Sequence, residues 1–188
     1  MSVITRSLTI FIASVLLAGA AFAQGPEGQS DQRSFRVNLY VVAGSGERAA
    51  SDKVKNAVKD LGDVFDIGNL KIGSAFYQRI SGGGSGSISS IQRDFAGYSI
   101  ENQPVFTEWQ VNVLDAQGAA GTVGFRRFFF KARVPSMVQN AVTYQSVETN
   151  VNNVRVWLGK PAVVATLKAP MSDSVLFLVL EAELADPA

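Results

Sequence analysis

A glycine-rich turn, Gly44-Ser45-Gly46-Glu47-Arg48-Ala49, is the first stretch whose residue types and spacing could support chemistry. The G-x-G-x-x-A pattern follows an apolar run and precedes a helix-like one, which is the outline of a dinucleotide-binding turn. Such a turn also needs a parallel strand after its helix and further strand–helix units. Because the strands expected after Leu70 alternate as hairpins do, we expect a strand-to-helix connector here and no bound cofactor.

Acidic residues around Gly62 could instead suggest a calcium site. Asp60, Asp63 and Asp66 are spaced three apart in the stretch DLGDVFDIG. Calcium takes roughly six to eight oxygen ligands, and the spacing of an EF-hand loop is missing. Gly62 is also expected to end the helix, which would separate the three carboxylates. We therefore expect solvated acidic residues in a turn and no metal.

Paired carboxylates could support glycoside hydrolysis. Glu181 and Glu183 would share one face of a strand, where we expect them to be exposed near the end of a sheet. The chain contains no His and no Cys. A Ser-His-Asp triad, a Cys nucleophile and a zinc site of Cys or His ligands are therefore excluded, and the fold must hold without disulfides. This favours a non-catalytic protein, with a carboxylate-dependent hydrolase or ligand carrier acting on envelope polysaccharide as the alternative.

The stretch FRRFFFKAR, residues 125–133, is the densest aromatic and basic cluster of the chain. One face of a strand built from it would resemble a stacking strip for single-stranded nucleic acid or another polyanion. The alternative is a solvated face whose basic residues oppose edge pairing. A chain with a formal net charge of only +1 has little bulk attraction for nucleic acid, so we expect none and regard this face as a candidate interaction surface. Alternation assigns Phe125, Arg127, Phe129, Lys131 and Arg133 to this face, and Arg126, Phe128, Phe130 and Ala132 to the other.

The N-terminus carries the pattern of a secretory signal peptide over residues 1–23. A short n-region ends at Arg6, the apolar run Leu8–Ala20 follows, and Ala21-Phe22-Ala23 provides an A-x-A-like cleavage site. The alternative, an uncleaved anchor, is disfavoured because a spanning helix needs roughly 20 apolar residues. Cleavage leaves 16 basic residues (17 minus Arg6) and 16 acidic ones, hence no net charge. We expect a periplasmic or secreted protein without a transmembrane helix in its mature part.

A leader, a strand and a helix are expected between the signal peptide and Leu70. Residues 24–34 (QGPEGQSDQRS) predict a flexible leader, and the alternating run Phe35–Ala43 predicts a half-buried strand. A helix follows, with Ser51 or Ser45 as its N-cap and Gly62 at the position after its end. Its apolar face consists of Val54, Ala57, Val58 and Leu61.

From Leu70 onward the apolar period returns to two. Ser81–Ser87 predicts a flexible hairpin tip, with a domain linker as the alternative. Residues 35–188 therefore predict one domain of a β-dominated α+β fold, with a subdivision near 81–87 as the alternative. Its strand–helix–strand start is followed by mostly antiparallel strands that form a sheet or a sandwich. Further strands are expected at Val105–Val113, Thr122–Val134, Ala141–Thr149, Val151–Leu158, Ala162–Leu167 and Ser174–Leu184.

The segment Asn150–Leu184 resembles the C-terminal motif of secretins, the ring-forming outer-membrane channels of secretion and pilus systems. The string VRVWLGKPAVVATL is similar to the secretin-type pattern V-x-V-x-x-G-x-x-V-V-x-G-x-L, with Ala165 in place of the second glycine. The apolar strand that follows is similar to the closing strand of that family. The resemblance implies a short exported relative of bacterial envelope machinery, or an accessory protein to it, and brings no catalytic residues. The matching positions are Val154, Val156, Gly159, Val163, Val164 and Leu167.

Apolar residues on both faces of Ser174–Leu180 indicate a strand that is covered on two sides. The cover would come from the helix or from a partner. Together with the missing catalytic sets, this favours an exported non-catalytic envelope protein whose sheet binds other envelope proteins or copies of itself.

Overall fold

The computed structural model describes most of the chain beyond its N-terminal region. Residues 1–23, which are predicted to be a signal peptide, lie outside the described residues, as do nearly all of the predicted leader and the centre of the glycine-rich turn. The described residues are 33–44, 48–62, 64–65, 69–115, 121–170 and 174–185.

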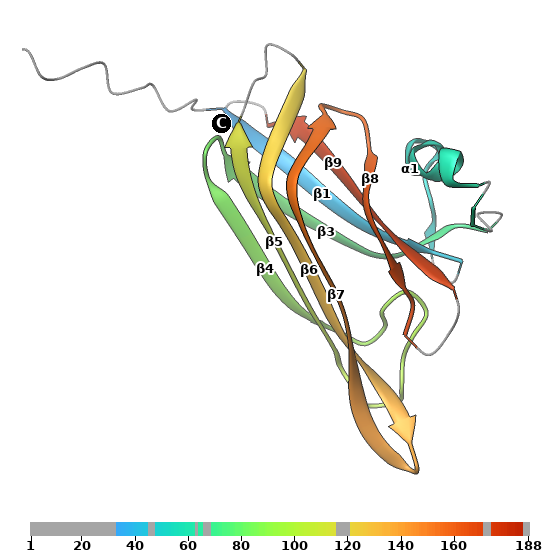
Figure 1. Ribbon diagram of the computed structural model, residues 1–188. Helices are drawn as coiled ribbons and strands as arrows, with labels where there is room; N and C mark the ends of the chain where they lie inside the picture. Colours follow the sequence, from blue (N-terminus) through green and yellow to red (C-terminus); the bar gives the residue numbers. More distant parts are fainter. Residues whose placement is uncertain are drawn as a thin grey trace, which may run out of the picture. The chain divides into compact units, whose positions relative to one another are not determined.

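Two antiparallel sheets form the body of the described structure (Figure 1). The expected β-dominated α+β fold, which begins strand, helix, strand and continues with antiparallel strands, is confirmed. The five-stranded sheet has the order β2-β3-β1-β9-β8, and the four-stranded sheet has the order β4-β5-β6-β7. The first consists of β1 (Ser34–Ala43), β2 (Arg48–Ala49), β3 (Lys71–Ser81), β8 (Ala162–Lys168) and β9 (Val175–Leu184). The second consists of β4 (Ser85–Gln92), β5 (Val105–Asp115), β6 (Thr122–Val138) and β7 (Ala141–Trp157).

The main core lies between the two sheets and follows from alternation along the strands. In β1 every second residue from Phe35 to Val41 is fully buried. Rings from both sheets meet there, since Phe76 of β3 lies 6.3 Å from Phe130 of β6 and 6.5 Å from Trp109 of β5, measured between ring centroids. Edge-to-face and tilted contacts of this kind add to the burial of large apolar surfaces.

The strand β9 is buried on both faces, as its sequence indicates. Leu178 and Leu180 belong to the core between the sheets, whereas Phe177 and Val179 belong to a second cluster on the opposite side of the five-stranded sheet. This second cluster includes Val54 and Val58 of the helix, together with Ala50 and Leu70. The helix therefore supplies the second cover that β9 requires.

The helix α1 (Asp52–Val58) begins as expected and ends in a tighter turn. Ser51 is its N-cap, because the Ser51 Oγ accepts a hydrogen bond from the Val54 N–H at 3.4 Å. A 3₁₀ turn, η1 (Lys59–Leu61), continues the helix. Gly62 follows this turn directly, as expected, with a φ of −63°. The tightened last turn closes the helix.

The Ser81–Ser87 segment is not the hairpin tip that the sequence predicts. It joins β3 of one sheet to β4 of the other, and the two strands do not pair with each other. The corner is tight, with the Gly84 N–H donating to the Ser81 carbonyl at 2.9 Å and Gly83 at a φ of +72°. Residues from Ser85 onward already belong to β4.

The strands β6 and β7 form a hairpin that continues past the end of β5. Their pairing runs from Thr122↔Trp157 to Val138↔Ala141, and Phe106 at the start of β5 pairs only as far as Arg133. The two strands expected at 141–149 and 151–158 are thus one strand. Gln139 and Asn140 connect β6 to β7 with positive φ values of 49° and 64°, as a two-residue type I′ turn requires.

Adjacent phenylalanines on β6 test the assignment of the inner and outer faces. Phe128→Ala removes a fully buried ring and should lower the free energy of unfolding by about 3–5 kcal/mol. Phe129→Ala truncates a partly exposed ring on the outer face and should cost less than about 1 kcal/mol. Urea denaturation of both variants measures the difference, and equal losses would contradict the assignment.

Candidate interaction surface

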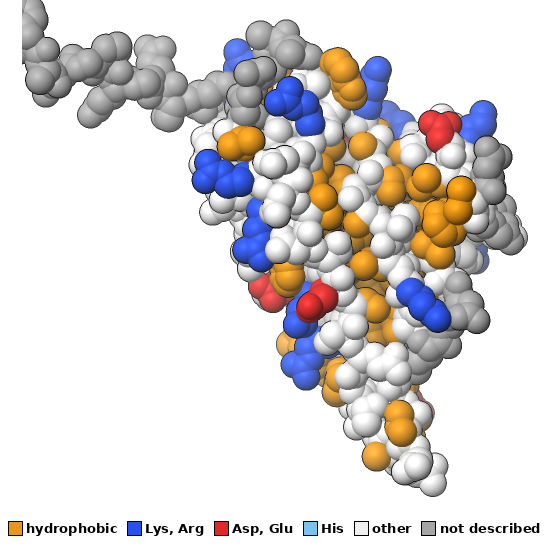
Figure 2. Space-filling model, in the orientation of Figure 1, with side chains coloured by type: hydrophobic (Ala, Val, Ile, Leu, Met, Phe, Trp, Pro, Cys, Tyr) orange, Lys and Arg blue, Asp and Glu red, His pale blue; other side chains and the backbone are white. Residues whose placement is uncertain are grey.

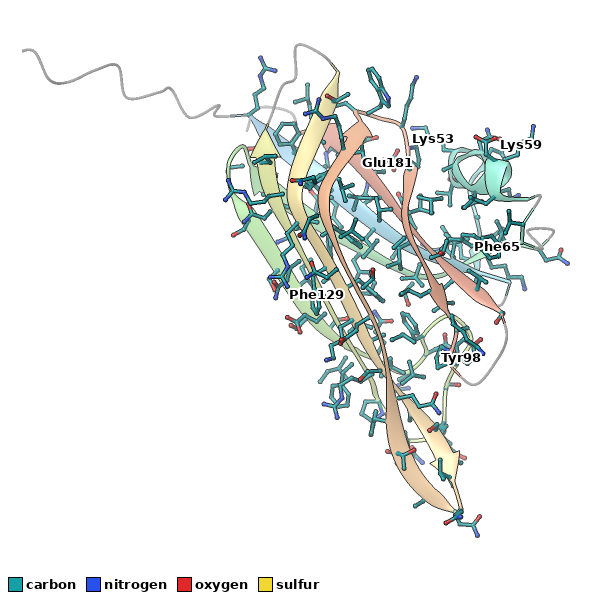
Figure 3. All side chains as sticks on the ribbon, viewed as in Figure 1. Lys53, Lys59, Phe65, Tyr98, Phe129 and Glu181 are labelled. Atoms are coloured by element: carbon teal, nitrogen blue, oxygen red, sulfur yellow. The ribbon has the colours of Figure 1, made fainter. Side chains whose placement is uncertain are left out.

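Four of the five residues predicted for the interaction surface do line the outer face of the four-stranded sheet. Arg127 and Arg133 are exposed, and Phe129 and Lys131 are partly exposed. Figure 3 labels Phe129 on this face of the sheet. Between Arg127 and Arg133 the side chains alternate as the sequence predicts, because the pairing with β5 and β7 is regular there.

Phe125 does not belong to this surface, and its assignment is corrected. Its side chain is fully buried in the core between the sheets. The reason is an irregularity in the pairing, which passes from Asn112↔Arg127 directly to Val113↔Phe125. The extra residue, Arg126, is exposed together with Arg127 and shifts the alternation by one position.

Polar contacts order the middle of this surface. The Lys131 Nζ lies 2.9 Å from the Glu148 Oε2. The Arg127 Nε–H donates to the Asn150 Oδ1 at 3.0 Å, and the Arg127 guanidinium lies 5.5 Å from the centre of the Phe129 ring. Exposed pairs of this kind add little to stability. Their effect is to hold the long side chains of β6 against β7.

The guanidinium of Arg133 lies against a pair of contacting aromatic rings, Phe106 and Tyr144, that sequence reasoning did not bring together. Its guanidinium carbon is 5.8 Å from the centre of the Phe106 ring and 5.5 Å from that of the Tyr144 ring. The two ring centroids are 5.7 Å apart. Phe106 comes from β5 and Tyr144 from β7, so only the sheet register reveals the cluster. One part of this cluster is predictable from the sequence, because the alternation of Val105–Val113 assigns Phe106 to the face opposite Trp109.

A shallow depression runs along this outer face and fits a binding surface better than an enclosed site. It includes Ser89 and Ile91 of β4, Glu108 of β5, and Lys131 and Arg133 of β6. Its charged groups have mixed signs, and Glu108 already accepts a hydrogen bond from the Gln110 Nε2 at 2.7 Å. Such a surface suits contact with another polar and apolar surface over a broad area.

The glycine-rich turn is described only at its ends, since residues 45–47 lie outside the described part. Its flanking strand argues against a dinucleotide fold, because β1 pairs antiparallel with both β3 and β9. A dinucleotide-binding unit needs a parallel neighbour.

The acidic residues near Gly62 are only partly described. Asp60 is exposed, and Asp63 and Asp66 fall outside the described residues. Within the described ranges, no group of three or more acidic side chains could hold a metal ion.

The expectation that Glu181 is exposed is wrong. Its side chain is 5% exposed because α1 lies over this side of the five-stranded sheet (Figure 3). The Glu181 Oε2 accepts a hydrogen bond from the Tyr40 hydroxyl at 3.1 Å, and its Oε1 lies 3.7 Å from the Nζ of Lys53 on α1. One carboxylate oxygen thus contacts β1 within the sheet, and the other contacts the helix. The carboxylate-dependent alternative gains no support from this residue.

The environment of Tyr40 disfavours its ionised form. Burial raises the pKa of Tyr40 to about 12, and the Glu181 carboxylate adds to the rise through its charge and its hydrogen bond. Tyr40 therefore stays protonated and donates to Glu181 over the whole neutral range.

Comparisons with known proteins do not assign a function to this chain. No family model and no curated protein matches the sequence. Among solved structures, the chain is similar to the secretin InvG of the Salmonella SPI-1 type III secretion injectisome (residues 176 to the end, open gate state), with 12% identity and a TM-score of 0.47. The match covers 83% of this chain and 62% of that one, so this chain spans less than two thirds of its length. No helix in the described part is long and apolar enough to cross a membrane.

The pKa of Tyr40 provides a test of the hydrogen bond between Tyr40 and Glu181. Because a raised pKa in the folded state favours the protonated form, the stability that it contributes is present below pH 10 and is lost as pH rises toward 12. Absorbance titration of the tyrosinates should show one late-titrating group that Tyr40→Phe removes. Glu181→Gln should lower its pKa, and an unchanged titration in that variant would contradict the contact.

Proposed function

We propose that this protein is exported to the bacterial envelope and binds protein partners, or further copies of itself, through the four-stranded sheet. The observation that carries the proposal is the open edge of β7. Among the described strands, β7 pairs with β6 alone and spans 17 residues. Over Ala141–Asn150 its only charged residue is Glu148, and it contains no Pro and no Lys. Natural edge strands are usually short, charged or covered, because an open edge is a template for pairing with another chain.

The opposite edge of the same sheet supports the same function. Among the described strands, β4 pairs only with β5, and Ser85–Gln92 contains no charged residue. The surface between the two edges carries the partly exposed Phe129 and the ring cluster around Arg133. Aromatic residues and Arg are enriched at protein interfaces. The two open edges offer backbone groups for pairing with a partner strand, and the face between them offers side chains for contact.

A role beside a secretion or pilus apparatus rests on the secretin-like segment Asn150–Leu184. In this chain the motif covers the end of β7, the turn at Gly159, and β8 and β9. Gly159 has a φ of +70°, and its N–H donates to the Ala182 carbonyl at 2.8 Å, which explains why a glycine stands there. The signal peptide over residues 1–23 and the periplasmic or secreted location are part of the same proposal.

The first experiment measures the mass of the purified exported protein in solution. Light scattering should give a multiple of the single-chain mass if copies pair along β7. Gln145→Lys puts a charge at an exposed position of the edge strand and should return the mass to that of one chain. Gln110→Lys, on the central strand β5, should leave the mass unchanged and serves as the matched control.

The second experiment asks which face contacts a protein partner in the cell. A photo-crosslinking phenylalanine analogue at Phe129 should capture an envelope protein or a second copy of this chain. The same analogue at Tyr77, an exposed ring on the five-stranded sheet, should capture little. A single-chain mass together with no crosslinked product at either position would overturn the proposed function.

A further inference from the structure

Exposed apolar side chains gather at one end of the four-stranded sheet. Of the ten large hydrophobic side chains that are exposed in the described residues, five lie at this end. Ile91 and Phe106 face each other across β4 and β5, and the other three lie around the β6–β7 turn. We call these three residues the hairpin tip: Met137, Val138 and Val142, with 53%, 50% and 40% of each side chain exposed.

The chain around the hairpin tip has no charge. Between Arg133 and Glu148 the sequence contains no Asp, Glu, Lys or Arg. Figure 2 shows orange and white at this tip, with blue side chains beginning further along the hairpin. An exposed, uncharged protrusion is unusual on a water-soluble surface, where apolar groups are normally scattered among charges.

The apolar side chains of the tip point to both faces of the hairpin. Met137 pairs with Val142, and the next pair toward the turn is Val138↔Ala141, whose side chains lie on the opposite face. A protein surface could cover one of these faces. A lipid phase surrounds the tip and covers both.

Several polar groups near the tip are paired across the hairpin, although the outer backbone edge of β7 stays open. The hydroxyls of Ser136 and Thr143 share a hydrogen bond of 2.9 Å, and the Thr143 hydroxyl also donates to the Ser136 carbonyl at 3.3 Å. The backbone ladder is paired as far as Val138↔Ala141. These bonds lower the cost of removing the tip from water. The amides of Gln139 and Asn140 at the turn limit the depth to the boundary between the headgroups and the acyl chains.

A cationic and aromatic belt lies directly behind the tip. Arg133 lies against the contacting rings of Phe106 and Tyr144, with its guanidinium 5.8 Å and 5.5 Å from the two ring centres. Aromatic rings and long cationic side chains are typical of the boundary between lipid and water, where the rings lie among the headgroups and the cation meets phosphate.

We propose that the hairpin tip docks on the surface of a phospholipid bilayer. Met137, Val138 and Val142 enter the boundary between headgroups and acyl chains, to a depth of about 5–10 Å. Arg133 meets the lipid phosphates at the level of the belt. The hairpin thereby holds the four-stranded sheet, with its open β7 edge, at the membrane surface.

Co-sedimentation with vesicles tests this docking. The exported protein should bind vesicles of phosphatidylcholine, and bind more tightly to vesicles of phosphatidylcholine and phosphatidylglycerol because of Arg133. The triple variant Met137→Ser, Val138→Ser, Val142→Ser should lose about tenfold or more in partitioning. All proteins compared come from the same exporting host and have the same N-terminus by mass spectrometry, so the leader contributes equally.

A matched control removes apolar surface at the other end of the same sheet. Trp157 and Leu114 are 59% and 45% exposed and lie near the Thr122↔Trp157 end of the hairpin. Trp157→Ser with Leu114→Ser should bind vesicles within about twofold of the parent. Lipids brominated on their acyl chains should quench a tryptophan placed by Met137→Trp and leave Trp157 unquenched.

Three results would overturn the proposal. The parent protein could fail to bind either kind of vesicle, or the triple variant could bind as the parent does. The triple variant could also change the mass in solution without changing vesicle binding, which would assign the tip to a protein contact. The loss of self-association in Gln145→Lys is measured without lipid, so failure of the proposed function is distinguished from failure of the docking.

Discussion

The whole structure depends on the packing of two apolar sheet faces against each other. Phe76 of the five-stranded sheet contacts the rings of Phe130 and Trp109 in the four-stranded sheet, and Phe95 stacks on Phe130 at 6.0 Å between centroids. The chain has no disulfide, so this buried surface has to provide much of the stability. Because every second residue of the central strands is committed to the core, the remaining residues are displayed on the outer faces.

The outer faces of the two sheets are covered differently. The outer side of the five-stranded sheet carries Phe177 and Val179, which α1 covers with Val54 and Val58. Lys53 of the same helix contacts the Glu181 carboxylate, so both apolar and polar contacts hold the helix on the sheet. In the described residues the four-stranded sheet has no such helix on its outer face. Its polar contacts, its ring cluster and its exposed apolar end therefore face solvent, which makes it the side available for binding.

A single extra residue in β6 determines which side chains this surface contains. Without the irregularity at Arg126, Phe125 would alternate onto the outer face with Arg127 and Phe129. The bulge returns Phe125 to the core and places two arginines side by side at the surface. The surface is consequently more basic and less aromatic than alternation alone predicts. Its second aromatic group comes from Phe106 and Tyr144 on the neighbouring strands.

The sequence by itself determined most of the elements and, except at Phe125 and Glu181, the faces of the strands that lie in the core. Period-two alternation identified Phe35–Ala43 and Val105–Val113, Ser51 identified the start of the helix, and the doubly apolar run at Ser174–Leu180 required two covers. These features are local, because the spacing of apolar residues and the capping of a helix depend on neighbours in the chain. Tertiary structure alone decided the division into two sheets and the corner at Ser81–Gly84.

Tertiary structure also decided the burial of Glu181 and the meeting of Phe106, Arg133 and Tyr144. Each of these depends on which strands pair and where a register slips. Pairing is set by the total burial of distant segments, and no local pattern of residues records it.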